Sequence, residues 1–135
     1  MPQESEVRRK VLFADDEAEI LELLEMTLED DERYRVLLAS NGEEALALCR
    51  AEHPELAFLD IRMPKLDGID VCREIRNDPA MSDMAVVMLT GNAQEIEIDR
   101  AMEAGADDYM TKPFSPTALH QKMLAALGLP DLDIS

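Results

Sequence analysis

Clustered zinc ligands are missing from this sequence, which has only two cysteines and two histidines among its 135 residues. Cys49 and Cys72 fall in helix-like segments and lack the paired Cys/His spacing that a zinc site needs. A small buried hydrophobic side chain is the commonest role of an isolated cysteine. We therefore expect both residues to be free thiols.

Positive charge is also scarce. The sequence has 13 Lys and Arg residues against 30 Asp and Glu residues, a net charge of -17. Such a charge repels phosphate backbones and anionic membranes, so direct binding to nucleic acid or to a membrane is not expected. No apolar run approaches the ~20 residues of a membrane span, and the start, MPQESEVRRK, has no signal-peptide core. These absences favour a cytoplasmic location.

The sequence does contain five alternations of a short apolar run with a helix-like segment. A length of 135 residues with 47% hydrophobic residues suits one domain with one core. The predicted strands are Lys10–Asp15, Tyr34–Ala39, Leu56–Asp60, Met84–Thr90 and Asp108–Thr111. Helical spacing and capping residues predict helices over 18–28, from a cap at Asn41 to Pro54, and over 67–76, 92–104 and 116–127.

The alternation predicts an α/β fold with a parallel sheet. Residues 11–14 and 85–89 are apolar at successive positions, which is typical of strands covered by helices on both faces. Right-handed crossovers restrict the topology. The expected solution is a doubly wound, flavodoxin-like five-stranded sheet in the order 2-1-3-4-5. Residues 34–39 alternate more in polarity, with Arg35 between Tyr34 and Val36, and suit an edge strand.

Polar residues follow four of the predicted strands at their carboxyl ends, where an open parallel sheet binds ligands. In the order 2-1-3-4-5 these four ends are neighbours. The residues that converge there are Asp15 and Asp16 after the first strand, Asp60 at the end of the third, Thr90 and Gly91 after the fourth, and Lys112 after the fifth. One crevice is thus predicted to hold three carboxylates, a hydroxyl, a glycine amide and an ammonium group.

Charge repulsion indicates what that crevice binds. Two like charges ~4 Å apart repel by about 4 kcal/mol at an effective dielectric constant of 20, so three close carboxylates must bind protons or a cation. Oxygen ligands alone favour Mg²⁺ or Mn²⁺. A carboxylate such as Asp60, beside a metal and Lys112, is a competent nucleophile towards phosphorus. Taken alone, Asp16 would instead be read as the N-cap of the following helix, with Glu19 completing a capping box.

Four motifs carry a resemblance to a known family. In order and spacing they are VLFADDE, LDIRMPKLDG, MLTGNA and GADDYMTKPF. This pattern resembles the receiver domain of two-component response regulators, of the bacterial chemotaxis-receiver type. The resemblance covers about residues 9–128, which leaves residues 1–8 and 129–135 as tails.

The resemblance implies roles for individual residues. Asp60 is expected to be the phosphoacceptor and Asp16 a direct Mg²⁺ ligand, with Asp15 acting largely through water. The backbone carbonyl of Arg62 is expected to be a further ligand. Arg62 and Asn92 are expected to border the approach of water to the phosphoryl group, so that Arg62 influences how long that group survives.

The resemblance also implies a switch. Lys112 is expected to pair with Asp60 or its phosphoryl group, Thr90 to turn towards the phosphate, and Tyr109 to move inward with it. The Gly91 amide is expected to donate to the phosphoryl group, although the family more often has alanine at this position. The peptide bond between Lys112 and Pro113 is expected to be cis.

The implied partners are a sensor histidine kinase or a phosphotransfer protein as phosphodonor. A downstream protein or a second copy of the chain is expected to bind the surface formed by residues 92–104, 108–111 and 116–127. The acidic residues Glu95, Glu97, Asp99 and Glu103 on the outer side of 92–104, against Arg100 alone, favour a partner with a basic rim or a dimer using Arg100.

Two alternatives remain at this point. One is a Mg²⁺-dependent phosphohydrolase with an aspartyl nucleophile, although such enzymes carry their Asp-x-Asp pair after the first strand. The other is a degenerate receiver that serves as a constitutive binding module. The expected function is phosphorelay signal transduction by a phosphoprotein switch that is not a conventional enzyme and that catalyses its own phosphorylation and dephosphorylation.

Overall fold

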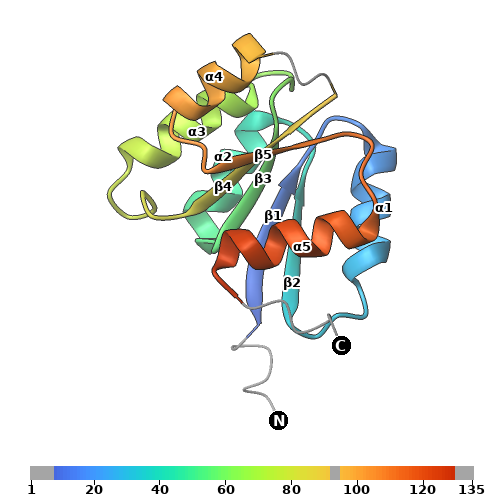
Figure 1. The fold of residues 1–135 in the computed structure, drawn as a ribbon. Coiled ribbons are helices and arrows are strands. Elements are labelled where there is room, and N and C mark those ends of the chain that lie inside the picture. The colour runs from blue at the N-terminus through green and yellow to red at the C-terminus, as the bar shows by residue number, and fades with distance from the viewer. Residues whose placement is uncertain (1–7, 92–94, 130–135) are drawn as a thin grey trace.

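The computed structural model describes residues 8–91 and 95–129, in which strands and helices alternate along the chain (Figure 1). The strands are β1 (Arg9–Ala14), β2 (Tyr34–Ala39), β3 (Leu56–Asp60), β4 (Ala85–Thr90) and β5 (Asp108–Thr111). The helices are α1 (Ala18–Leu28), α2 (Gly42–Glu52), α3 (Gly68–Asn77), α4 (Glu95–Glu103) and α5 (Pro116–Leu127).

The five strands form one parallel sheet in the order β2-β1-β3-β4-β5. This confirms the predicted fold class and strand order, and it places β2 at an edge as expected. The order reverses between β1 and β3, because β2 lies on one side of β1 and the later strands lie on the other. The carboxyl ends of β1, β3, β4 and β5 therefore meet along one rim of the sheet.

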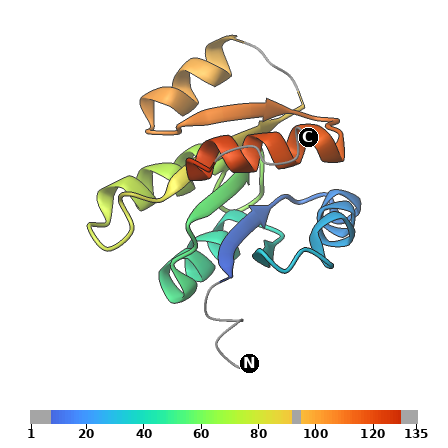
Figure 2. The ribbon, with the colours of Figure 1, turned by 60° about the horizontal axis from the view of Figure 1, so that its bottom comes forward.

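Helices cover both faces of the sheet, as Figures 1 and 2 show together. Side chains of α1 and α5 pack on one face and side chains of α2, α3 and α4 on the other, and each face has its own buried apolar cluster. The cluster between the sheet and helices α1 and α5 includes Phe13 and Phe58. These two residues are register partners on β1 and β3, and their stacked rings are 4.9 Å apart. This rigid pair lies two residues before Asp15 and Asp60 and fixes the start of both polar ends.

The helix ends mostly follow the predicted capping residues. The Asn41 side chain accepts a hydrogen bond from the Glu44 amide at 2.9 Å, and Ser115 caps α5 in the same way. The Glu44 carboxylate in turn accepts a hydrogen bond from the amide of Ser40 at 2.8 Å. At the other end of α5, Gly128 adopts a left-handed conformation with φ 69°, which suits glycine.

Several element boundaries differ by one residue from the sequence prediction, and three of them concern loops near the strand and helix ends. β1 ends at Ala14, so that Asp15 begins the loop. Asp67 is the N-cap of α3 and not its first helical residue. Met84 belongs to the turn before β4, because its amide donates to Met81 and its carbonyl accepts from Arg76. The predicted start of the fourth helix at Asn92 lies outside the described residues.

The two cysteines are buried and free, as predicted. Burial raises the pKa of the Cys49 thiol to about 12 and that of Cys72 to about 11, which keeps both thiols protonated and unreactive. Of the helices in the described residues, none combines the length and apolar character of a membrane span.

Candidate functional site

Three elements bring two carboxylates onto one ammonium group. The Lys112 Nζ atom, after β5, lies 3.0 Å from Asp15 Oδ2 after β1 and 3.1 Å from Asp60 Oδ2 at the end of β3. Asp15 is fully buried and Asp60 is 5% exposed. The polar residues that the sequence places at separate strand ends thus form one compact, largely desolvated group.

Backbone amides fix the orientation of both carboxylates. The second oxygen of Asp15 accepts a hydrogen bond from the Glu17 amide at 2.9 Å, and the second oxygen of Asp60 accepts one from the Arg62 amide at 3.1 Å. Each carboxylate is therefore held on one side by its own loop and on the other by Lys112. This arrangement presents preorganised oxygens at the rim of the sheet.

The acidic residues form a cluster that can hold a metal ion. Oxygen atoms of Asp15, Asp16, Glu17 and Asp60 all lie within 4.8 Å of one another. Asp16 and Glu17 are exposed at the mouth of the site. Lys112 supplies one positive charge to this group, since it also lies 3.3 Å from Glu17. Four carboxylates against one ammonium leave an excess of negative charge that favours a cation.

The first turn of α1 contradicts the reading of Asp16 as a helix cap. The N-cap residue of α1 is Glu17, and its side chain makes no capping hydrogen bond. Asp16 precedes the cap and is not used to begin the helix. Glu17 itself was missed as a site residue from the sequence, although it is the third acid in the run DDE. Its ion pair with Lys112 joins residues 95 positions apart and depends on the sheet.

The environment shifts the pKa of two site residues. Burial, and then the negative charge of Asp15, raise the pKa of Asp60 to about 6 despite its hydrogen bonds to Arg62 and Lys112. Burial alone would lower the pKa of Lys112, but the hydrogen bond to Asp15 and the charge of Asp60 outweigh it, so the pKa of Lys112 is raised. Lys112 is thus firmly cationic, and ionised Asp60 is costly without a further positive charge.

The raised pKa of Asp60 predicts a pH-dependent penalty on folding in metal-free protein. Asp60 binds its proton more tightly in the folded state than in the unfolded state, because its pKa is higher in the folded state. The resulting contribution to stability is fully present below the unfolded pKa and is lost as the pH rises through about 6. Asp60→Asn removes the penalty. The free energy of unfolding of Asp60→Asn minus that of the parent protein should be about 1 kcal/mol larger at pH 7.5 than at pH 5.

Urea denaturation in the presence of EDTA measures this difference at each pH. Asp99→Asn, at an exposed position on α4, is the matched control and should show little change across the same range. A gain in Asp60→Asn that stays constant from pH 5 to pH 7.5 would contradict the raised pKa.

The remaining predicted residues surround this group at different depths. Thr90 is 3% exposed at the end of β4, and its carbonyl accepts from the Lys112 amide at 2.8 Å. Gly91 is exposed, and a Cβ atom there would meet nothing within 4 Å, so alanine would also fit. Tyr109 on β5 is 36% exposed and points away from the core. The bond between Lys112 and Pro113 is cis, as expected.

Arg62 forms an ion pair that the sequence did not predict. Its Nη2 atom lies 2.6 Å from Glu97 Oε2 on α4. The prediction that Glu97 lies on the outer side of its helix is wrong, because its side chain is only 15% exposed. Helix α4 packs with this position turned towards the β3–α3 loop. A cavity of about 680 Å³ lies beside the acidic cluster, and its lining includes Arg62, Glu97, Asp16 and Arg100. Asn92, the other residue expected here, lies outside the described residues.

Comparison with known proteins gives one consistent result. The model of the response regulator receiver domain family matches residues 11–124. Among curated proteins, the alkaline phosphatase synthesis transcriptional regulatory protein PhoP of Bacillus subtilis (strain 168) is 44% identical over 121 residues. That match covers 90% of this chain and 49% of PhoP, so the chain spans about half the length of the curated relatives it matches.

Solved structures agree in fold. A response regulator receiver domain protein (CheY-like) from Methanospirillum hungatei JF-1 has a TM-score of 0.82 and 30% identity, with 90% of this chain and 94% of that chain covered. The receiver domain of sensor histidine kinase PA1611 from Pseudomonas aeruginosa PAO1 has a TM-score of 0.82 and 27% identity, with 90% and 98% covered. That domain was crystallised with a magnesium ion coordinated in its active-site cleft.

Proposed function

This chain belongs to the response regulator receiver domain family, and on that basis we propose that it is a phosphorelay switch whose Asp60 accepts a phosphoryl group. The donor is a sensor histidine kinase or a phosphotransfer protein. The observation that carries the proposal is the buried Asp60 carboxylate, which shares Lys112 with Asp15 within an acidic cluster. A carboxylate with both a cation and an ammonium group beside it suits phosphoryl transfer.

The donor set fits Mg²⁺ or Mn²⁺, because the cluster offers carboxylate oxygens and no nitrogen or sulfur ligand. Asp16 and Asp60 are the proposed direct ligands, with the Arg62 backbone carbonyl as a third and Asp15 acting through water. The likeness to PA1611, crystallised with magnesium in its cleft, supports this assignment. When bound, the ion supplies positive charge that offsets the negative charge of the transferring phosphoryl oxygens.

The chain's own residues perform the transfer in this proposal. An Asp60 oxygen attacks phosphorus, an O–P bond forms, and the N–P bond to the donor imidazole breaks with its electron pair returning to that nitrogen. Lys112 moves from the free carboxylate to the phosphoryl oxygens. The Thr90 hydroxyl and the Gly91 amide donate hydrogen bonds to the same oxygens. The phosphoryl group later leaves by hydrolysis, so the chain is not a conventional enzyme with turnover of a separate substrate.

Loading by a small phosphodonor tests this function. With Mg²⁺ and acetyl phosphate, the intact protein should gain the mass of one phosphoryl group, and EDTA should prevent the gain because the acidic cluster then lacks its cation. Mass spectrometry under both conditions gives the answer. Loading that is unaffected by EDTA would remove the metal from the proposal, and steady turnover of a phosphomonoester would favour a hydrolase instead.

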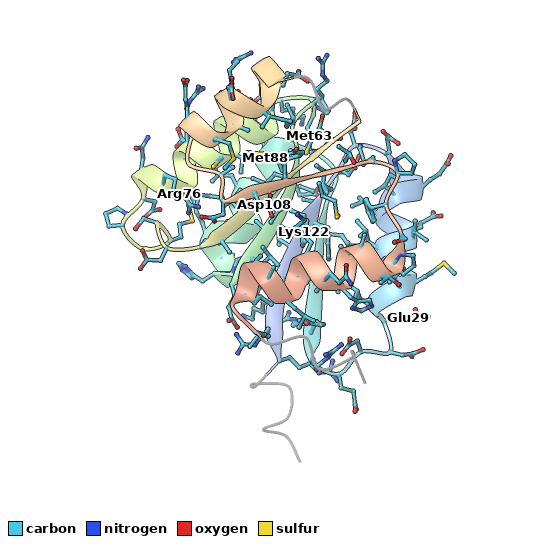
Figure 3. The ribbon with its side chains drawn as sticks, viewed as in Figure 1. Glu29, Met63, Arg76, Met88, Asp108 and Lys122 are labelled. Atoms are coloured by element: carbon cyan, nitrogen blue, oxygen red, sulfur yellow. The ribbon has the colours of Figure 1, made fainter. Side chains whose placement is uncertain are left out.

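We propose that phosphorylation changes the surface formed by α4, β5 and α5, where a downstream protein or a second copy of the chain binds. Thr90 leads towards α4, Tyr109 lies on β5, and Lys112 leads into α5, so one phosphoryl group reaches all three elements. Tyr109 and Met102 are exposed large side chains on this surface. Lys122 of α5 reaches Asp108 of β5 at 2.8 Å and ties two of the elements together (Figure 3).

Amide chemical shifts measure this response directly. Beryllofluoride, a phosphoryl mimic, should shift amides across 95–129, while amides of α2, which covers the other side of β1, should change little. The reason is that a ligand shifts an equilibrium only between states to which it binds unequally. Lys112 follows β5 and Glu97 of α4 binds Arg62, whereas α2 contributes no residue to the described site. Changes confined to the loops around Asp60 would contradict a surface switch.

The same proposal covers the extent and surroundings of the unit. Residues 9–128 are proposed as the receiver unit, because β1 begins at Arg9 and α5 is capped by Gly128. The net charge of -17 supports protein partners over direct contact with nucleic acid or membrane. A cytoplasmic location is proposed because ATP-derived phosphodonors are found there.

A further inference from the structure

We propose that the Arg62–Glu97 ion pair is an exchangeable latch: Arg62 holds Glu97 of α4 before phosphorylation and transfers to the phosphoryl group on Asp60 afterwards. This inference rests on the proposed function of Asp60. It assigns Glu97 as a positioning residue that acts through Arg62. The pair joins residues 35 positions apart and is the contact between the β3–α3 loop and α4 that lies beside the acidic cluster.

The two partners of the latch differ in exposure, and the exposed arginine makes the pair exchangeable despite its short distance. The Arg62 side chain is 76% exposed, so water competes for its guanidinium group. The Glu97 side chain, in contrast, is only 15% exposed. Its Oε1 atom is buried without a hydrogen-bond partner among the described residues. Loss of Arg62 would leave this desolvated carboxylate without a partner, so the Glu97 side chain must turn into water as the arginine leaves. The exposed guanidinium group, for which water already competes, is what makes the pair exchangeable.

The phosphoryl group is the stronger competitor for the arginine. Arg62 is tethered beside Asp60, since its amide already donates to Asp60 Oδ1 at 3.1 Å. A phosphoryl group on Asp60 carries more negative charge than Glu97 and offers oxygens to which a guanidinium group binds in a bidentate manner. Arg62 therefore needs only a side-chain rotation, because its backbone is already in place. Glu97 loses its partner in the exchange, and α4 loses one contact with the site.

The exchange has two consequences in the reaction. Hydrolysis requires water to attack phosphorus as the O–P bond to Asp60 breaks, which releases inorganic phosphate and restores the carboxylate. A guanidinium group paired with the phosphoryl oxygens obstructs that approach and lengthens the lifetime of the phosphoryl group. Competition from Glu97 shortens it, because Arg62 then spends part of its time on α4. Glu97 thus sets the lifetime without touching the reacting atoms.

A double-mutant cycle on phosphoryl lifetime tests the latch. The 135-residue protein is loaded with acetyl phosphate and Mg²⁺, the donor is removed, and loss of the phosphoryl group is followed by mass spectrometry. Glu97→Gln should lengthen the half-life about two- to fivefold, the range expected from loss of one partly exposed ion pair. Arg62→Gln should shorten it. The double variant should match Arg62→Gln, since Glu97 acts only through Arg62.

Glu74→Gln is the matched control, because Glu74 forms an exposed ion pair with Arg50 far from the site and should leave the half-life unchanged. Normal loading with an unchanged half-life in Glu97→Gln would overturn the latch and leave the proposed function intact. The latch is also overturned if Glu97→Gln changes the half-life equally in the parent protein and in Arg62→Gln. Failure of the parent protein to load would instead overturn the proposed function, and the latch with it.

Discussion

Replacement of Asp60 by asparagine is expected to abolish phosphoryl loading. The amide of asparagine has nearly the same shape as the carboxylate, so it preserves the packing of a side chain that is only 5% exposed. It lacks the negative charge that makes the oxygen nucleophilic towards phosphorus, so no O–P bond forms. The adduct seen with the parent protein, acetyl phosphate and Mg²⁺ should be absent from the mass spectrum of Asp60→Asn.

The raised pKa of Asp60 argues against unfolding as the reason for this loss. Asp60→Asn relieves the penalty of ionising a buried acid next to Asp15, so the variant should be at least as stable as the parent protein near neutral pH. Asp83→Asn, at an exposed position before β4 and therefore at the opposite end of the sheet, is the control and should load fully. If Asp60→Asn still gains one phosphoryl group, another residue is the acceptor.

Removal of the Asp16 carboxylate is expected to have the largest effect on metal binding. Asp16 is exposed at the mouth of the cluster and makes no hydrogen bond or ion pair with the other described residues, so its oxygens are available to an ion. Asp15 differs, because its oxygens already bind Lys112 and the Glu17 amide. Asp16→Asn should weaken Mg²⁺ binding by about tenfold or more, equivalent to about 1.4 kcal/mol, and Asp15→Asn should weaken it less.

Titration calorimetry with Mg²⁺ alone measures both variants without any phosphodonor. A second measurement is the thermal midpoint, because an ion that binds only the folded state raises it in proportion to binding. Mg²⁺ should raise the midpoint of the parent protein clearly and that of Asp16→Asn little. Equal Mg²⁺ affinity in the parent protein and Asp16→Asn would remove Asp16 from the metal site, and a larger effect in Asp15→Asn would reverse the two proposed roles.

The sequence predicted the order of elements and the rim where the site lies. Apolar runs and helical spacing are local properties, and the alternation of the two leaves few ways to build a parallel sheet. The carboxyl ends of β1, β3, β4 and β5 are then neighbours in a sheet of the order 2-1-3-4-5. This is why Asp15, Asp60 and Lys112 could be brought together from the sequence before their distances were known. The cis bond before Pro113 and the free cysteines were also predicted correctly.

The tertiary structure alone decided which charged residues pair. No site role was predicted for Glu17, and Glu97 was predicted on the outer side of its helix, yet one binds Lys112 and the other binds Arg62. The rotation of a helix about its axis depends on how its apolar side packs on the sheet, and α4 has a thin apolar set that fixes this rotation poorly from the sequence. Side-chain pairs between distant segments follow from that packing, because local spacing does not carry the information.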